Sequence, residues 1–210
     1  MEIAVVDYGM GNLRSVSKAI EHVAADATVR ITARPEDLRR ADRVVVPGQG
    51  AMPDCMRELR ERGLAEAVIE AAGAKPFLGI CIGLQMLFGR SEEGGVDGLA
   101  ILPGTVRRFP SGLLDQTGIP LKIPHMGWNE VAQSRAHPLW AGIPDASRFY
   151  FVHSYYADAV GSDFESGGCT YGVPFTAAIA RDNMFGVQFH PEKSQSAGLK
   201  LLRNFVNWHP

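Results

Sequence analysis

Residues 76–85 read PFLGICIGLQ, and this stretch narrows most strongly the folds that the chain can adopt. An apolar run ends at Gly79, Cys81 follows between two glycines, and a helical pattern comes next. The layout Gly-x-Cys-x-Gly is typical of a nucleophile elbow, a tight strand-to-helix turn that exposes one side chain. The glycines fit this interpretation because a Cβ at either position would collide with the neighbouring turn. The helix that follows would aim free N–H groups at the thiol and favour the nucleophilic thiolate.

A buried structural cysteine is the alternative interpretation, because cysteine is among the most buried residue types. The chain holds three cysteines, Cys55, Cys81 and Cys169, which are widely spaced and form no Cys-x-x-Cys pair. We therefore expect no disulfide framework and no zinc site. Cys55 and Cys169 lack both an elbow and a nearby base, so we expect them to be inert thiols.

Length and charge limit the classes of protein to consider. The 210 residues, 46% of them apolar and 21% charged, suffice for one substantial core, and we expect a single domain over residues 1–210. The net charge of -2 argues against nucleic acid or an anionic membrane as the main partner. The N-terminal run Ile3–Val6 is too short to span a bilayer and has no basic region before it. With its free thiols, the chain is predicted to be cytoplasmic.

Short apolar runs alternate with helical patterns over the first 85 residues. Runs at 3–6, 43–46 and 76–80 predict buried strands. Asn12 is in position to cap a helix that begins at Leu13. Residues 56–72 predict one helix, with a buried side made of Leu59, Leu64, Val68 and Ile69. This order of elements predicts βαβ units and an open, mostly parallel central sheet flanked by helices.

The middle of the chain has a different pattern. From about residue 96 to 183, short runs such as Thr105–Phe109 and Arg148–Val152 alternate with Gly, Pro, Asp and Ser. This pattern predicts antiparallel strands added to the parallel core, with Phe149 and Phe151 buried. A late strand at Phe185–Phe189 and a helix from residue 198 to 208 close the chain. The predicted fold class is α/β with an added antiparallel β portion.

The late strand ends in Phe189-His190-Pro191-Glu192, which offers a base for the thiol. A nucleophilic cysteine needs a base, and the base needs a group that orients it. His190 and Glu192 are two residues apart on a segment that we expect to be extended, so their side chains would leave the same face. This segment and the elbow both lie at carboxyl ends of strands, where open α/β sheets place their sites. We therefore predict a catalytic triad of Cys81, His190 and Glu192.

Acyl transfer also needs donors for an oxyanion. The N–H of Ile82, directly after the nucleophile, is one candidate. A second candidate is the loop Pro47-Gly48-Gln49-Gly50, whose glycines allow backbone amides to approach a substrate. A plain turn is the alternative interpretation of this loop, and a phosphate loop is disfavoured because the Lys-Ser/Thr pair is missing.

Three separated motifs occur together in one order: Pro47-Gly48-Gln49-Gly50, residues 79–85 (GICIGLQ) and His190-Pro191-Glu192. With them the chain, from residue 3 to about 206, resembles the class I (triad) glutamine amidotransferases, which have a flavodoxin-like fold. The resemblance implies hydrolysis of glutamine to glutamate and ammonia through a thioester on Cys81, without a cofactor. It also implies that Gln85 contacts bound glutamine and that the Gly48–Gly50 loop helps to hold the substrate and the oxyanion.

Four further segments resemble one branch of that family, the glutaminase subunits of imidazole glycerol phosphate synthases. They are residues 7–13 (DYGMGNL), 124–129 (PHMGWN), 150–155 (YFVHSY) and 190–194 (HPEKS). The resemblance implies a heterodimer with a (β/α)8-barrel cyclase, which uses the ammonia in histidine biosynthesis. It implies that the Ser154-Tyr155 backbone helps to bind the α-carboxylate of L-glutamine. The residues that would face the cyclase are Asn12, Trp128, Tyr150 and Lys193.

Two other functions are compatible with parts of this pattern. A stand-alone cysteine hydrolase could act on peptides or small amides, but Gln85 and the cyclase-type segments count against it. A binding module could keep the fold without the chemistry, but the intact Cys, His and Glu set counts against that.

Gln49 stands where many relatives carry a small apolar residue, so the sequence leaves the resting orientation of the Gly48–Gly50 loop open. We expect His153 to have a structural role.

Overall fold

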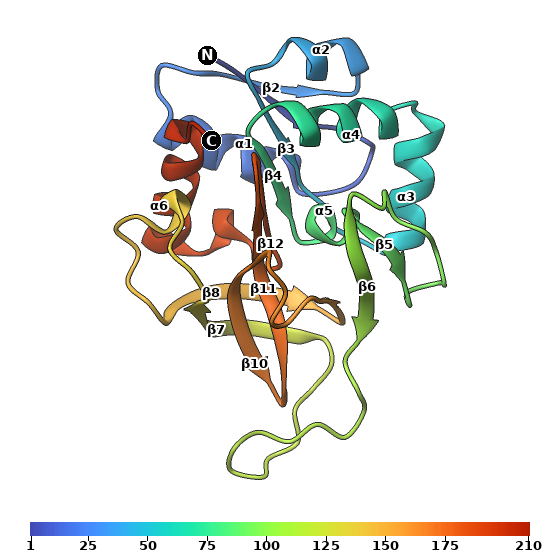
Figure 1. The fold of residues 1–210 in the computed structure, drawn as a ribbon, viewed down its shortest axis with the longest axis vertical. Coiled ribbons are helices and arrows are strands. Elements are labelled where there is room, and N and C mark those ends of the chain that lie inside the picture. The colour runs from blue at the N-terminus through green and yellow to red at the C-terminus, as the bar shows by residue number, and fades with distance from the viewer.

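The strands form one mixed sheet that is parallel in one half and antiparallel in the other (Figure 1). A computed structural model describes residues 1–210. The parallel strands are β1 (Glu2–Val6), β2 (Thr28–Thr32), β3 (Arg43–Val46), β4 (Phe77–Ile80) and β12 (Met184–Val187). Their order is β2-β1-β3-β4-β12, and each neighbouring pair is parallel. The predicted strands at 3–6, 43–46 and 76–80 and the mostly parallel central sheet are confirmed.

The antiparallel half continues from β12. Its strands, in spatial order, are β11 (Val173–Arg181), β10 (Glu165–Tyr171), β7 (His125–Gln133) and β8 (Ser147–His153). A side branch holds β5 (Phe88–Ser91), β6 (Leu102–Arg108) and β9 (Tyr155–Asp158), of which β9 pairs with both β6 and β11. The predicted antiparallel portion is confirmed, although β5 lies before its expected start and pairs with β6 in parallel.

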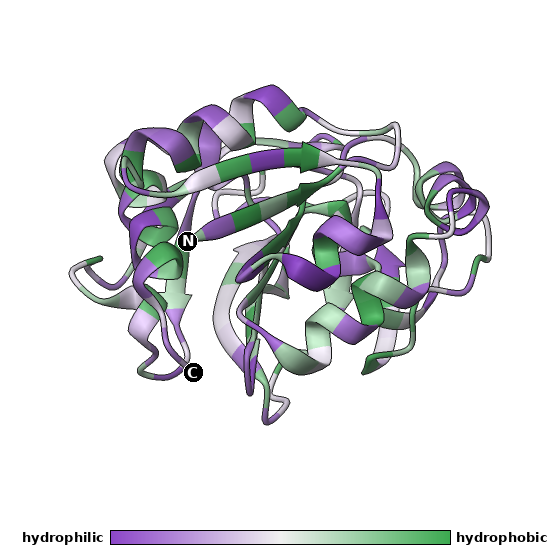
Figure 2. Ribbon diagram, turned by 90° about the horizontal axis from the view of Figure 1, so that it is seen from above, coloured by the Kyte–Doolittle hydropathy of each residue, from purple (hydrophilic) through white to green (hydrophobic).

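Helices flank the parallel half in two groups (Figure 2). Helix α1 (Leu13–Val23) packs against α6 (Gln195–Asn207), and α2 (Pro35–Arg40) packs against α4 (Ala65–Ala74). Helix α3 (Met52–Glu61) contacts the short helix α5 (Ile82–Gln85). Buried apolar side chains from strands and helices form one continuous core, which includes Phe149 and Phe151 as predicted. The core thereby fixes the carboxyl ends of β3, β4 and β12 beside one another.

The segment predicted as one helix over 56–72 is two helices, α3 and α4. Gly63 has φ +66, a left-handed conformation that ends α3. The N–H of Leu64 donates to Leu59 O and the N–H of Gly63 donates to Arg60 O, which is the Schellman pattern of a helix end. Because α4 begins on a new axis, Ile69 is 43% exposed and the prediction that it is buried was wrong.

Two elements at the sheet edge were not predicted from the sequence, one capping role was wrong, and two boundaries differ. Strand β2 pairs only with β1 at the sheet edge and is mostly exposed, so it carries no buried apolar run, and the short helix α2 follows it. Asn12 precedes α1, but its side chain makes no capping hydrogen bond, so the capping role was wrong. The late strand ends at Val187, before the predicted Phe189, and α6 begins at Gln195, before the predicted residue 198.

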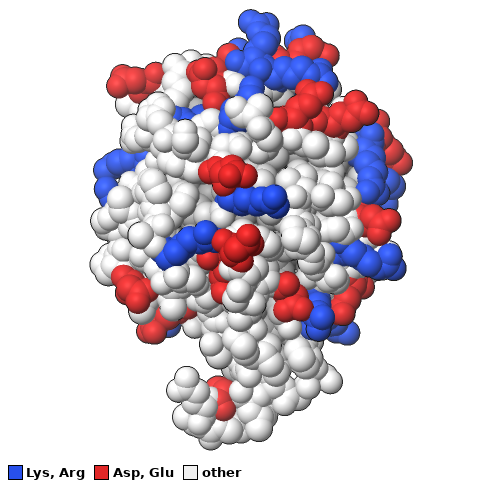
Figure 3. Space-filling model, viewed as in Figure 1, with Lys and Arg blue, Asp and Glu red and all other residues white.

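The visible surface carries both signs of charge. Figure 3 shows basic and acidic side chains interspersed over the parallel half and few charges on the lower projecting part. Figure 1 places the long loop between β6 and β7 in that projection. This face therefore lacks the single-sign basic patch that is typical of nucleic-acid binding. No helix has the length and apolar character needed to cross a bilayer.

Candidate active site

Cys81 lies in the turn between β4 and α5, in a backbone conformation that few residues adopt. Its φ is 55 and its ψ is -107, and its N–H donates to Val187 O of the adjacent strand at 2.7 Å. A Cβ on Gly79 would lie 2.7 Å from Gly83 O, and a Cβ on Gly83 would lie 1.9 Å from Val46 O. Both flanking glycines are therefore required by close backbone contacts, as the elbow predicted.

A cavity of about 310 Å³ opens over Cys81. Its lining includes most of the side chains and backbone segments that sequence analysis singled out: Gln49, Gly50, Cys81, Ile82, Gln85, Ser154, Tyr155 and His190. These residues come from the loop after β3, the elbow, the junction of β8 with β9 and the segment after β12. The fold thus brings together residues that are up to about 140 positions apart in the chain.

His190 and Glu192 form a buried pair beside this cavity. His190 Nδ1 lies 2.9 Å from Glu192 Oε1, and the two side chains are 3% and 1% exposed. The prediction of an extended segment was wrong, because residues Pro191–Lys193 form a 3₁₀ turn. Pro191 occupies the first position of that turn, which its fixed φ favours. The turn, rather than a shared strand face, brings the carboxylate back to the ring.

The environment of His190 favours its protonated form. Burial lowers the pKa of His190, but the charge of the nearby Cys81 and the contact with Glu192 outweigh burial and raise that pKa to about 10. The Ser194 hydroxyl donates to His190 O at 2.6 Å and fixes the backbone there. His190 Nε2 is buried and has no partner within the chain, so it is free to exchange a proton at the cavity.

Two glutamines connect the cavity floor to Cys81. Gln85 Nε2 donates to Tyr155 O at 2.9 Å and to Gln188 Oε1 at 3.0 Å. Gln188 Nε2 in turn donates to Cys81 Sγ at 3.7 Å. Gln85 Oε1 is buried without a partner, so Gln85 offers an acceptor to the cavity. Sequence analysis missed Gln188, whose only signal was a polar residue at the end of an apolar strand.

Glu93 also lines the cavity and was missed. Its Oε2 accepts from the N–H of Met52 at the first residue of α3, at 2.8 Å. In the sequence it belongs to a polar Ser-Glu-Glu-Gly-Gly stretch that is typical of an exposed turn. In the structure this carboxylate gives the cavity a negatively charged end.

The residues expected to face a partner lie in two separate places. Trp128 is 37% exposed, its ring lies 6.0 Å from that of Tyr150, and Lys193 Nζ lies 5.9 Å from the Tyr150 ring. These three residues form one aromatic and basic surface cluster. Asn12 lies apart from them, in a small recess shared with Gln49, His190 and Glu192.

His153 belongs to a buried pair that supports the cavity wall. His125 Nδ1 lies 2.9 Å from His153 Nε2, and His153 Nδ1 lies 2.8 Å from Tyr155 O. Because a carbonyl can only accept, His153 donates through Nδ1 and His125 donates to His153. Burial lowers the pKa of His125 to about 4 and that of His153 to about 3. The pair is therefore neutral and fixes the Tyr155 peptide.

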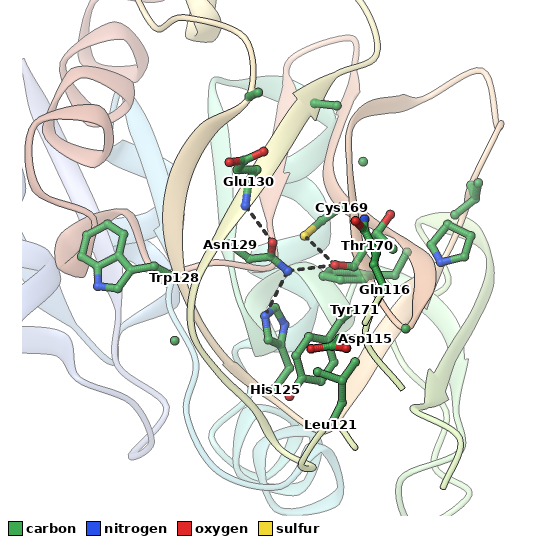
Figure 4. A pocket seen from close by; sticks show the side chains of 18 of the residues that line it. Asp115, Gln116, Leu121, His125, Trp128, Asn129, Glu130, Cys169, Thr170 and Tyr171 are labelled. Carbon is green, nitrogen blue, oxygen red and sulfur yellow. Dashed lines mark hydrogen bonds between the residues drawn. The ribbon is translucent and has the colours of Figure 1, made fainter. Parts of the chain in front are cut away.

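A groove larger than this cavity lies beyond His125, away from Cys81. This groove of about 1090 Å³ lies between the loop before β7 and the strands β7 and β10. Figure 4 shows Asn129 in its wall, bonded both to His125 and to the Thr170 carbonyl. Cys169 also lines the groove, and burial raises its pKa to about 12. Such a thiol is a poor nucleophile, so the smaller cavity over Cys81 is the candidate active site.

Comparisons with known proteins agree with this geometry. The family model described as "Glutamine amidotransferase class-I" matches residues 4–208. "Imidazole glycerol phosphate synthase subunit HisH" of Nitrosospira multiformis is 63% identical over 210 residues, covering 100% of this chain and 99% of that protein. The protein of the same name from Thiobacillus denitrificans is 61% identical over 211 residues, covering 100% of this chain and 92% of its own. The solved structure of PurLQS from Thermotoga maritima is 18% identical, with TM-score 0.71 and coverage of 98% and 97%.

The chain therefore belongs to the class-I glutamine amidotransferases, and the likeness to PurLQS shows the same fold. The resemblance found in the sequence is confirmed at this level. Identity of about 60% over the full chain places it more narrowly, among the HisH subunits of imidazole glycerol phosphate synthase. It is accordingly a glutaminase subunit of that synthase, an enzyme of histidine biosynthesis.

Proposed function

We propose that Cys81, His190 and Glu192 hydrolyse the side-chain amide of L-glutamine. The Cys81 thiolate attacks the amide carbon, and His190 gives its Nε2 proton to the departing nitrogen, which leaves as ammonia. A water molecule then attacks the thioester while His190 takes its proton, and the C–S bond breaks to release glutamate. The observation that carries this proposal is the buried His190–Glu192 pair, whose free Nε2 lies at the same cavity as Cys81.

The cavity lining supports selection of glutamine over other amides. The N–H of Ile82 at the head of α5, with the N–H groups of the Gly48–Gly50 loop, would donate to the oxyanion. The unpartnered Gln85 Oε1 suits an N–H of the substrate and disfavours a carboxylate in the same place. The backbone at Ser154 and Tyr155 would receive the α-carboxylate, and the Glu93 carboxylate at the charged end would receive the α-ammonium.

The ammonia would pass to a (β/α)8-barrel cyclase subunit in a cytoplasmic heterodimer. Ammonia released into water at neutral pH is protonated and loses its nucleophilicity, so an enclosed route to the acceptor is required. The surface cluster of Trp128, Tyr150 and Lys193 supports docking of a partner, because aromatic residues dominate binding energy at interfaces. Asn12, which lines a small recess together with His190 and Glu192, would face the same partner close to the active site.

A Cys81→Ala variant tests the catalytic proposal. It should abolish glutamine-dependent ammonia release while the melting temperature and cyclase binding stay unchanged, because only the Sγ atom is lost. Normal glutamine turnover by this variant in the complex would refute the assignment of Cys81. Release of amines from peptides, without preference for glutamine, would favour a general cysteine hydrolase.

The docking proposal needs a separate variant. Trp128→Ala should weaken cyclase binding by about 30-fold or more, the range of an interface hot spot, as measured by calorimetry. Ile69→Ala is the matched control, since Ile69 is another exposed apolar residue but lies on α4, away from the surface cluster. Equal affinities for both variants would contradict the proposed interface.

A further inference from the structure

The carbonyls of Pro47 and Gln49 are hydrogen-bonded from behind the loop by two buried side chains. The Tyr8 hydroxyl donates to Pro47 O at 2.8 Å, and Cys55 Sγ donates to Gln49 O at 3.5 Å. Tyr8 and Cys55 are each 0% exposed. Each has a single proton to donate, and the loop uses both of them.

The N–H groups of the same loop have no such partners. Nothing in the chain accepts a hydrogen bond from the N–H of Gly48, Gln49 or Gly50. Within one planar peptide the N–H points opposite to the carbonyl. The N–H groups of Gly48 and Gly50 therefore point away from Tyr8 and Cys55, while Gln49 and Gly50 line the cavity with Cys81.

The loop needs such a restraint because its glycines do little to restrict the direction of the loop peptides. Gly50 has φ +110, a region where glycine moves at low cost. Gly48 packs so tightly against the elbow helix that a Cβ there would lie 2.5 Å from Ile82 Cβ. The position of the loop is thus fixed by packing, whereas the direction of its peptides depends on what bonds to the carbonyls.

Both side chains keep their protons at neutral pH. Burial raises the pKa of Cys55 to about 11, against a smaller lowering by the nearby Tyr8 hydroxyl. Burial also raises the pKa of Tyr8 above its usual value. Cys55, which the sequence suggested was inert, is therefore poorly suited to be a nucleophile but well suited to donate a hydrogen bond.

We propose that Tyr8 and Cys55 are positioning residues that hold the Pro47 and Gln49 carbonyls away from Cys81 and so keep the N–H groups of Gly48 and Gly50 available to the oxyanion. This inference rests on the proposed glutaminase chemistry of Cys81 and adds to it. It assigns the resting loop an orientation in which its carbonyls at 47 and 49 do not obstruct the site. Neither residue touches the substrate, because both act through the loop backbone.

Kinetics of Cys55 variants test this inference in the full chain bound to the cyclase subunit. Cys55→Ala should lower kcat for glutamine hydrolysis by about 2- to 10-fold, the effect of losing one hydrogen bond. The KM for glutamine should stay unchanged, because the oxyanion forms only during the reaction and is absent from the bound substrate. Cys55→Ser should restore kcat, since its hydroxyl again donates to Gln49 O. Tyr8→Phe should lower kcat in the same way without changing the shape of the ring.

Cys169→Ala is the matched control, because it removes another buried thiol from the antiparallel half. It should leave kcat unchanged. Unchanged kcat for both Cys55→Ala and Tyr8→Phe, or failure of serine to restore kcat where alanine lowers it, would overturn the inference. Cys81→Ala separates the two proposals: activity that survives it refutes the catalytic assignment, whereas activity that depends on Cys81 but not on Cys55 or Tyr8 refutes only the positioning role.

Discussion

The Nδ1 atom of His190 lies 2.9 Å from Oε1 of Glu192, and both side chains are almost fully buried. Glu192 accepts the Nδ1–H and thereby turns Nε2 toward the cavity, where it has no other partner. The carboxylate also stabilises positive charge on the ring. Glu192 is therefore placed to orient the base without meeting the substrate.

This relationship predicts unequal effects of two variants. His190→Ala should lower kcat for glutamine hydrolysis by about 10² to 10⁴-fold, the usual contribution of a general acid and base. Glu192→Ala should lower it less, because a misoriented imidazole still transfers protons part of the time. Steady-state kinetics in the complex measure both values. An equal or larger loss for Glu192→Ala would show that its role exceeds orientation.

The pairing of these two residues was predictable from the sequence, but its geometry was not. His190 and Glu192 stood out because they followed an apolar strand and because a cysteine elbow needed a base. Their contact was expected from an extended segment, whereas a 3₁₀ turn that begins at Pro191 brings them together. A two-residue spacing places the two side chains together both in an extended segment and in a 3₁₀ turn, so the sequence could not distinguish these conformations.

Replacement of glycine by alanine should have opposite effects on stability at Gly83, in the elbow, and at Gly73, in helix α4. Gly83→Ala should prevent folding or shift the elbow, because the new Cβ would lie 1.9 Å from Val46 O. Gly73→Ala, in helix α4 with open space around it, should raise the free energy of unfolding by roughly 0.5–1 kcal/mol. Chemical denaturation of both variants measures the difference. A stable and active Gly83→Ala protein would contradict the described close contact.

Gln188 supplies a third test, because it donates to the reacting sulfur. Gln188→Leu should lower kcat by about 10-fold or more, since a hydrogen bond to a charged group is lost and Gln85 loses an acceptor. Gln133→Leu is a suitable control: Gln133 also makes a side-chain hydrogen bond, to Ile143 O, but outside the site. The control should lose stability while keeping its kcat. Similar kcat values for the two variants would argue against a role for Gln188.

Gln188 and Glu93 illustrate what the sequence does not reveal about the site. Each reaches the cavity because of long-range packing, β12 beside β4 for Gln188 and the side branch beside α3 for Glu93. Neither belongs to a pattern that has chemistry of its own. Strand β2 was missed for a related reason, since an exposed edge strand has no continuous apolar run. The elbow, the loop at 47–50 and the core strands were predictable because local backbone needs dictate their residues.

The buried histidine pair predicts loss of stability in mild acid. The unfolded chain protonates its histidines near pH 6.5, whereas folded His125 and His153 resist protonation until about pH 4 and 3. Between these values the unfolded state binds more protons, so the free energy of unfolding falls as the pH falls from 6.5 toward 4. His125→Gln should make this decline shallower, and His22→Gln, on the exposed side of α1, should not. Identical pH profiles for wild type and His125→Gln would contradict the prediction.

The central claim, that Cys81 carries the glutamyl group, can be examined directly by rapid acid quenching during turnover and mass spectrometry of the digested chain. A γ-glutamyl thioester should be found on the peptide that holds Cys81 and should be absent from the peptides that hold Cys55 and Cys169. Its level should fall to zero in Cys81→Ala. A glutamyl adduct on another residue, or steady glutamine hydrolysis by Cys81→Ala, would contradict the account.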